Sequence, residues 1–305
     1  MTAGPSPTQP ARLSRLAALA LLWGSNFLWI KLALRGFAPA QLVFARLALG
    51  ALVLTVFLRA RGDHLPRGRA VWAHLTLAAI FACVVPYLLF AYGEQRVDSS
   101  IAGLLNATTP LWTALIAMAV RLERDVTPMK VAGLAIGFVG ALVIFEPWRL
   151  GSQVLSWGGL ACLAAAACYG VSFVYMARYL RRPELSPLAL SAGQLIVSAA
   201  LTALTLPLLG RAALQFRADA IVAVVVLGAM GTGLAYLINY QLIAESGASR
   251  TAVVTYLLPV VAVALGALVL GEMLAPHALV GAAVVLAGVA LTRRRPAPIA
   301  PVSRS

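Results

Sequence analysis

Long runs of apolar residues, separated by short polar stretches, follow one another along this 305-residue chain. A helix of about 20 apolar residues crosses the roughly 30 Å hydrocarbon core of a bilayer. The sequence therefore predicts an all-α polytopic membrane protein with ten transmembrane helices. The ten segments are 16–34, 40–58, 70–93, 99–120, 128–145, 156–178, 187–209, 219–243, 249–271 and 275–292.

Composition supports a membrane protein and argues against several other classes. Charged residues make up 11% of the chain, against about 25% in soluble domains. The net charge of +14 does not indicate nucleic-acid binding, because that would need a soluble basic face. Cys83, Cys162 and Cys168 all lie in apolar runs, where small packing residues are expected. We expect no metal, no cofactor and no nucleic-acid partner.

Basic residues predict the orientation of the helices, because cytoplasmic loops are enriched in Lys and Arg. With the amino terminus inside, the cytoplasmic loops and tails hold seventeen basic residues and the outer loops hold five. Both termini are therefore predicted to be cytoplasmic. Arg12 and Arg15 before an apolar run imitate the start of a secretory signal, but no small-residue cleavage site follows. We interpret the run as a retained first helix.

The two halves of the chain repeat one another. An offset of 149 residues matches Pro110 to Pro259, Glu123 to Glu272 and Tyr87 to Tyr236. Five helices in each half make the repeats inverted, an arrangement typical of transporters with a site near the bilayer midplane. The predicted parts are a cytoplasmic tail at 1–15, a first repeat at 16–145, a linker at 146–155, a second repeat at 156–292 and a basic cytoplasmic tail at 293–305.

Three sequence patterns carry a family resemblance. "LLWGSNFLWIK" stands at 21–31, and a proline, Gly-Glu, glycine pattern closes each half: Pro259, Gly271-Glu272 and Gly281 in the second, Pro110, Leu122-Glu123 and Gly133 in the first. The chain resembles the EamA-type transporters of the drug/metabolite transporter superfamily, in particular the YddG-like exporters of aromatic amino acids. The resemblance implies export of small metabolites from a bacterial inner membrane, with no enzymatic activity.

Polar and aromatic residues inside the spans form the candidate substrate site. Polar groups are costly in lipid, so they usually face the bundle interior. Helical spacing places several of them on shared faces. The candidates are Trp23, Asn26, Arg46, Tyr87, Asn106, Tyr169, Tyr236, Asn239, Tyr240 and Thr255. Hydrogen bonding between helices and aromatic belts at the membrane surface are the alternative roles. Together they predict an aromatic-lined cavity for a small amphipathic solute.

Arg46 has two possible roles. It lies about two turns from the outer end of its predicted helix, so its side chain can reach the interface by snorkelling. Alternatively it binds an anion, for instance a substrate carboxylate, which a guanidinium grips with two hydrogen bonds. Gln194 occupies the matching position in the second half when 186–195 is aligned with 38–47.

Prolines and glutamates give candidates for movement. Pro86, Pro110 and Pro259 interrupt predicted helices and are expected to act as hinges. Glu123 and Glu272 precede predicted helix starts, where they cap a helix, pair between helices or act in gating. Gly133 and Gly137 form a close-packing pair, consistent with a monomer or a weak homodimer.

The sequence is also compatible with other functions. Drugs, sugar phosphates and nucleosides are alternative cargoes. A channel would need a charged ring or filter motif, and neither is present in the sequence. An intramembrane enzyme would need clustered acids, a metal constellation or an activated nucleophile, and His64, His74 and His277 are scattered. The predicted partners are a small-molecule substrate and the lipid bilayer.

Overall fold

The computed structural model confirms an all-helical membrane architecture. It describes residues 9–93, 95–97, 99–122, 127–149, 156–181, 184–210, 213–270 and 276–293, and assigns no strand among them. Seven helical segments are long and apolar enough to cross a bilayer. Three shorter apolar helices, Pro187–Ala203, Ala248–Val261 and Pro276–Thr292, coincide with the remaining three predicted spans.

The described residues of the first half form nine elements. They are α1 (Gln9–Gly24), α2 (Asn26–Ala33), α3 (Pro39–Ala60), α4 (Arg69–Ala79), the π-helical η1 (Ile80–Val84), α5 (Val85–Gly93), α6 (Ser99–Asn106), α7 (Thr109–Ala119) and α8 (Pro128–Phe145). A short 3₁₀ turn, η2 (Pro147–Arg149), follows them.

The second half repeats this succession. It contains α9 (Trp157–Tyr175), the π-helical η4 (Met176–Leu180), α10 (Pro187–Ala203), the short α11 (Leu206–Leu209), α12 (Ala218–Val226), the π-helical η5 (Leu227–Leu234), α13 (Ala235–Ser246), α14 (Ala248–Ala252), α15 (Val254–Leu270) and α16 (Pro276–Arg293).

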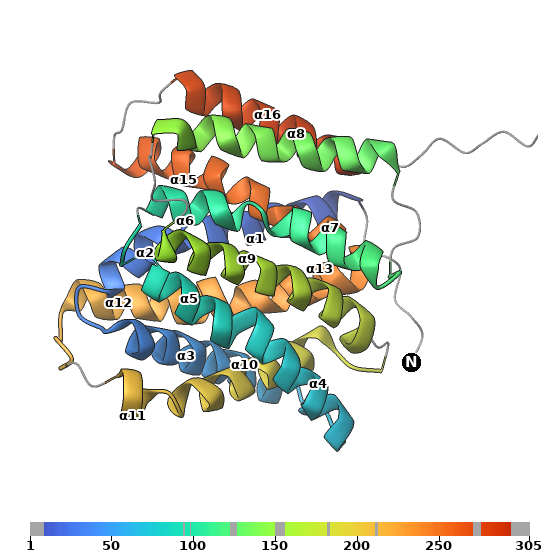
Figure 1. Ribbon diagram of the computed structural model, residues 1–305. Coiled ribbons are helices and arrows are strands. Elements are labelled where there is room, and N and C mark those ends of the chain that lie inside the picture. Colours follow the sequence, from blue (N-terminus) through green and yellow to red (C-terminus); the bar gives the residue numbers. More distant parts are fainter. Residues whose placement is uncertain are drawn as a thin grey trace, which may run out of the picture.

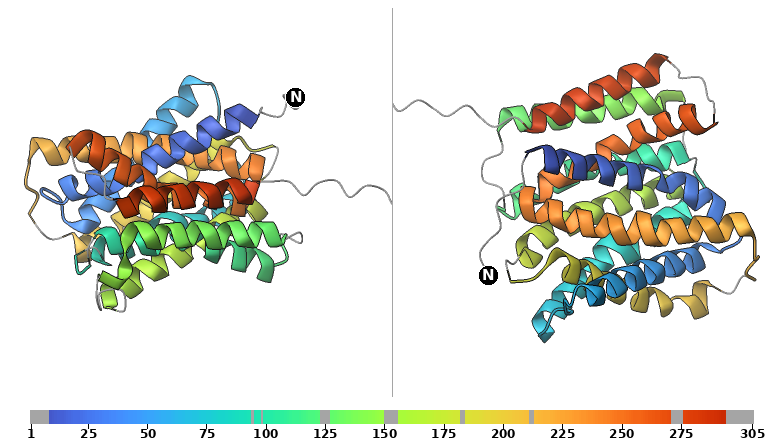
Figure 2. Two further views of the ribbon diagram at one scale, coloured as in Figure 1. Left: turned by 90° about the horizontal axis from the view of Figure 1, so that it is seen from above. Right: turned by 180° about the vertical axis from the view of Figure 1, so that it is seen from behind.

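Packing between the halves has the symmetry that a repeat requires. Helix α3 packs on its counterpart α10, and α8 packs on its counterpart α16. The repeat pairs α1 with α9, α5 with α13 and α7 with α15. The contact between α5 and α9 therefore corresponds to the contact between α13 and α1, and the contact between α7 and α9 corresponds to that between α15 and α1. In Figure 1 the α8–α16 pair lies at one edge of the bundle and the α3–α10 pair at the other. Both views in Figure 2 place the start of α1 and the end of α16 at the same end of the bundle.

Local sequence explains where several helices begin. Proline stands in the first turn of α3, α8 and α10, where its missing N–H costs no hydrogen bond. The hydroxyls of Thr127, Ser156 and Ser186 accept hydrogen bonds from the backbone N–H groups three residues on. These caps place the starts of α8, α9 and α10.

The close-packing glycines act within the chain. A Cβ atom added to Gly137 would lie 2.9 Å from the Tyr256 ring, and one added to Gly133 would lie 2.7 Å from Thr292. From the facing helix, a Cβ atom on Gly288 would lie 2.4 Å from the Gly137 backbone nitrogen. The glycine motif therefore brings α8 and α16 together, while the oligomeric state stays a prediction.

Candidate functional site

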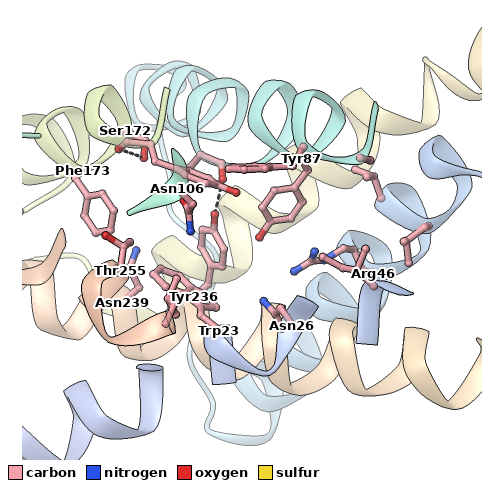
Figure 3. A pocket seen from close by; sticks show the side chains of 18 of the residues that line it. Trp23, Asn26, Arg46, Tyr87, Asn106, Ser172, Phe173, Tyr236, Asn239 and Thr255 are labelled. Atoms are coloured by element: carbon pink, nitrogen blue, oxygen red, sulfur yellow. Dashed lines mark hydrogen bonds between the residues drawn. The ribbon is translucent and has the colours of Figure 1, made fainter. Parts of the chain in front are cut away.

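A central cavity of about 100 Å³ lies where the two halves meet. Nine of the ten candidate substrate residues line it: Trp23, Asn26, Arg46, Tyr87, Asn106, Tyr169, Tyr236, Asn239 and Thr255. They come from α1, α2, α3, α5 and α6 of the first half and from α9, α13 and α15 of the second. Figure 3 labels all of these residues except Tyr169 and shows the labelled side chains converging from both halves. A volume of this size holds several water molecules.

Two aromatic pairs form part of the cavity wall. Trp23 meets Tyr236 edge to face, with ring centroids 6.3 Å apart. Phe90 stacks on Tyr169 at 5.9 Å. Phe90 and Phe173 also line the cavity, although neither was a candidate. An apolar residue in an apolar helix carries no pattern of its own, so nothing in the sequence distinguishes these two from lipid-facing residues.

Tyr240 is the candidate that does not line this cavity. Its hydroxyl donates a hydrogen bond to the Gln194 side-chain oxygen on α10. It lines a second hollow of about 310 Å³, which also includes Arg181 and Met176. Met176 lines both spaces, so it stands between them. Tyr240 follows Tyr236 by one helical turn of about 5.4 Å, which carries its side chain past the end of the cavity.

Tyr236 uses its hydroxyl to satisfy a carbonyl that proline leaves free. In an α-helix the N–H of residue 86 would bond the Ala82 carbonyl four residues earlier, and Pro86 has no N–H. The Tyr236 hydroxyl donates to that carbonyl at 2.7 Å. It also accepts a hydrogen bond from the Cys83 thiol at 3.1 Å. The ring of Tyr236 therefore faces the cavity while its polar end binds η1.

Arg46 lies inside the cavity rather than at the interface. Its side chain is buried, with the residue 5% exposed. Nε donates to the Thr232 hydroxyl on η5 at 3.1 Å, and the guanidinium lies over the Tyr87 ring, 4.3 Å from its centroid. Snorkelling, the first of the two roles that the sequence allows, is therefore wrong.

Three amide side chains add donor and acceptor groups. The Asn106 oxygen accepts from the Thr109 hydroxyl at a long 3.4 Å. The side-chain oxygens of Asn26 and Asn239 are buried and have no hydrogen-bond partner among the described residues. The Asn26 oxygen packs against Gly231. A Cβ atom added to Gly231 would lie only 2.2 Å from that oxygen. Figure 3 shows the amide nitrogens of Asn26 and Asn106 directed into the cavity, where they can donate to a polar solute.

The three prolines occupy different helical contexts. Pro86 follows the π-helical η1, and Pro110 lies in the first turn of α7 after a break at 107–108. Pro259 lies inside α15, which continues from Val254 to Leu270. Their role as hinges stays a prediction. Glu123 and Glu272 lie outside the described residues.

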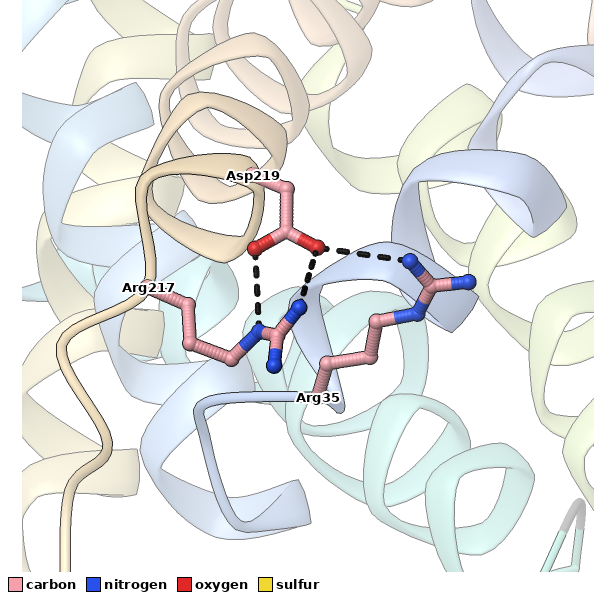
Figure 4. Close-up of polar contacts among 3 residues, drawn as sticks. All are labelled: Arg35, Arg217 and Asp219. Atoms are coloured by element: carbon pink, nitrogen blue, oxygen red, sulfur yellow. Dashed lines mark hydrogen bonds and ion pairs between the residues drawn. The ribbon is translucent and has the colours of Figure 1, made fainter.

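Ion pairs connect the α1–α2 span to the α12–α13 span at both ends. At one end Arg15 pairs with Glu245. At the other, Asp219 accepts from Arg35 at 3.3 Å and from Arg217 at 3.1 Å (Figure 4). The hydrogen bond to Asp219 raises the pKa of Arg217. An exposed pair such as Arg35–Asp219 adds little stability, so these ion pairs mark where the two spans meet without holding them there.

The sequence matches those of known transporters, and the fold matches that of a solved structure. The model of the EamA-like transporter family matches twice, at residues 14–146 and 156–294. A probable terminal-alkyne amino-acid exporter from Streptantibioticus cattleyicolor is 31% identical over 288 residues, 92% of each chain. The uncharacterized transporter YdfC from Bacillus subtilis is 28% identical over 273 residues, 89% of this chain and 87% of that one. A crystal structure that covers 93% of this chain and 98% of its own has a TM-score of 0.77 at 23% identity and supports the fold.

Proposed function

Because the chain belongs to the EamA-like transporter family, we propose that it exports small metabolites, chiefly amino acids including aromatic ones. The two halves would expose the central cavity to each side of the membrane in turn. The protein would act in the bacterial inner membrane with both termini in the cytoplasm. The distribution of Lys and Arg between loops supports that orientation.

The observation that carries the proposal is the composition and position of the cavity. Aromatic rings, amide groups and one guanidinium converge from both halves on one space. Sites for small solutes are mostly apolar with a few placed polar groups. In a repeat-built transporter a site between the halves can open to either side as the halves rock. An aromatic amino acid has the matching combination of a flat apolar ring and a charged polar end.

A relative gives independent support for the cargo. The Streptantibioticus protein that aligns over 92% of both chains is a probable exporter of a terminal-alkyne amino acid. Amino acids are therefore the first solutes to test. Sugar phosphates, nucleosides and drugs form the alternative group of cargoes.

Uptake into liposomes that contain the purified protein tests the proposal. Radiolabelled phenylalanine, tryptophan and alanine would be supplied with and without an imposed pH gradient. Trp23→Ala removes an indole from the cavity wall, and Trp157→Ala removes one that is 79% exposed on the outside of the bundle. We expect saturable uptake in the parent protein, its loss in Trp23→Ala and its retention in Trp157→Ala.

Two outcomes would count against the proposal. If no amino acid is taken up, the cargo assignment is wrong, and the assay moves to nucleosides and sugar phosphates. If both tryptophan variants retain uptake equally, the central cavity is not on the transport path. Dependence of uptake on the pH gradient would decide between facilitated and proton-coupled transport.

A further inference from the structure

We propose that the cavity selects solutes bearing a carboxylate, and that Arg46 is the residue that binds this group. The inference rests on the proposed transport function and specifies the chemistry of its substrate. It predicts that an amine lacking the carboxylate is rejected even when its size and ring are unchanged.

Arg46 has the donors that such a contact needs. Its Nε is used by Thr232 and its flat face by the Tyr87 ring. These two contacts hold the guanidinium in place and leave the two terminal nitrogens without a hydrogen bond to the described residues. Figure 3 shows the nitrogens directed toward the space between Asn26 and Tyr87. A guanidinium held this way presents two parallel donors, the arrangement that matches a carboxylate.

The charge of Arg46 is not balanced by the part of the chain that the structure describes. No Asp or Glu lines the cavity, and no described carboxylate lies within 4.0 Å of Arg46. A buried cation is costly unless an anion and hydrogen bonds compensate for its lost hydration. A bound carboxylate supplies that anion, so the cavity favours an acidic group over a second cation.

The inverted repeat shows that this cation is an addition to a shared framework. Arg46 on α3 bonds Thr232 in η5, and Gln194 on α10 bonds Cys83 in η1 with a nitrogen–sulfur distance of 3.6 Å. The same repeat offset that matches Tyr87 to Tyr236 also matches Cys83 to Thr232. The two contacts are therefore equivalent, one in each half.

The two equivalent side chains differ in what they leave free. Gln194 is fully buried and also accepts from the Tyr240 hydroxyl, so protein groups use both ends of its amide. It does not line the cavity, whereas Arg46 does. Packing needs only a polar group that reaches the π-helical segment. The two terminal nitrogens of Arg46 serve no such contact, which leaves them for a ligand.

The rest of the cavity fits the other parts of an amino acid. The buried Asn239 oxygen lacks a partner among the described residues and can accept from an ammonium group. In Figure 3, Asn239 and Thr255 lie across the cavity from Arg46. The stacked Phe90–Tyr169 pair and Trp23 provide surfaces for an apolar side chain. The carboxylate would therefore sit at the α3 side of the cavity.

Three probes that share one ring separate these contributions. L-Phenylalanine has both charged groups, 3-phenylpropionate lacks the amine, and phenethylamine lacks the carboxylate. Binding to the purified protein in lipid nanodiscs would be measured by titration calorimetry. Arg46→Gln keeps a donor for Thr232 and copies the residue at the equivalent position, so folding should be preserved. Arg46→Lys keeps the positive charge but lacks the two parallel donors of the guanidinium. Arg250→Gln, which removes an exposed arginine, is the matched control.

We expect the parent protein and Arg250→Gln to bind both carboxylates, and phenethylamine at least about tenfold more weakly, because a charged bidentate contact is lost. Arg46→Gln should lose about tenfold or more in affinity for both carboxylates. The affinity of Arg46→Lys should lie between those of the parent protein and Arg46→Gln. Equal binding of phenethylamine, unchanged binding by Arg46→Gln, or no binding of either carboxylate would each overturn the proposal. Carboxylate binding without liposome uptake would instead contradict only the transport function.

Discussion

The hydrogen bond from the Tyr236 hydroxyl to the Ala82 carbonyl is predicted to stabilise the helix that contains η1, and this prediction can be tested by mutation. Removing the hydroxyl with Tyr236→Phe leaves the ring in contact with Trp23 but strips the Ala82 carbonyl of its donor. Because Pro86 has no N–H, residue 86 cannot replace that donor. Pro86→Ala supplies a backbone N–H that can reach the carbonyl. The effect of Tyr236→Phe should therefore depend on residue 86.

The expected size follows from the burial of the groups involved. Tyr236 is 3% exposed and Ala82 is 2% exposed, so water does not reach the bond from the surface. A buried acceptor without a donor costs about 1–3 kcal/mol. Measured hydrogen bonds between membrane helices average about 0.6 kcal/mol and reach about 1.7. We expect Tyr236→Phe to lower the free energy of unfolding by about 1–2 kcal/mol, and by about 1 kcal/mol less when Pro86 is replaced.

Reversible unfolding in mixed detergent micelles, followed by circular dichroism, would provide the four free energies of the double-mutant cycle. Tyr256→Phe is the matched control. Tyr256 is also fully buried and donates to the Leu134 carbonyl at 2.9 Å, but that carbonyl lies inside the continuous helix α8 and keeps its helical donor. Tyr256→Phe should therefore lower the free energy of unfolding by less than Tyr236→Phe. If Tyr236→Phe costs the same with and without Pro86, the proline does not create the need for this hydroxyl.

Three further predictions concern packing, the site and topology. Gly288→Val should lower the free energy of unfolding by about 1–3 kcal/mol, because a Cβ atom there lies 2.4 Å from the Gly137 backbone; detergent melting would measure this. Thr232→Val removes the acceptor of Arg46 and should weaken calorimetric binding of phenylalanine about two- to tenfold. With native cysteines replaced, Gln215→Cys should react with an impermeant maleimide in intact cells and Asp63→Cys only after permeabilisation.

Controls for these three come from the same chain. Ala287→Val adds similar bulk to an exposed position beside Gly288, so equal melting losses would show that the helix crossing is not the cause. Thr55→Val removes a hydroxyl that bonds its own helix, and an equal loss of binding would exclude a specific effect at Thr232. Labelling of Asp63→Cys in intact cells would reverse the orientation inferred from Lys and Arg.

The π-helical segments show why side-chain direction is hard to foresee in this protein. Segments η1 and η5 fall at matching places in the two halves, and both contribute to the polar contacts behind the cavity. A π-helical turn shifts the phase of every residue that follows it. Glycines at 228, 231 and 233 let α3 and α2 approach η5 closely, and that approach brings Thr232 within reach of Arg46.

The sequence by itself determined the helices, the repeat and most of the cavity wall. Apolar length fixes the spans because each must cross the same hydrocarbon thickness. The cost of polar groups in lipid sends them to the interior, which is why nine of the ten candidates meet in one cavity. Matching prolines, glutamates and tyrosines at one offset reveal the repeat. Because each half has five helices, an odd number, the two halves are inverted relative to one another.

Only the tertiary structure decided which partner each interior side chain has. Tyr236 and Tyr240 are one turn apart on one face, yet one reaches the cavity and the other binds Gln194 on α10. Phe90 joins the wall without any polar signal. Arg46 could have pointed to the interface or inward, and Thr232 and Tyr87 hold it inside. These outcomes depend on contacts between residues far apart in the chain, which helical periodicity, a local property, does not contain.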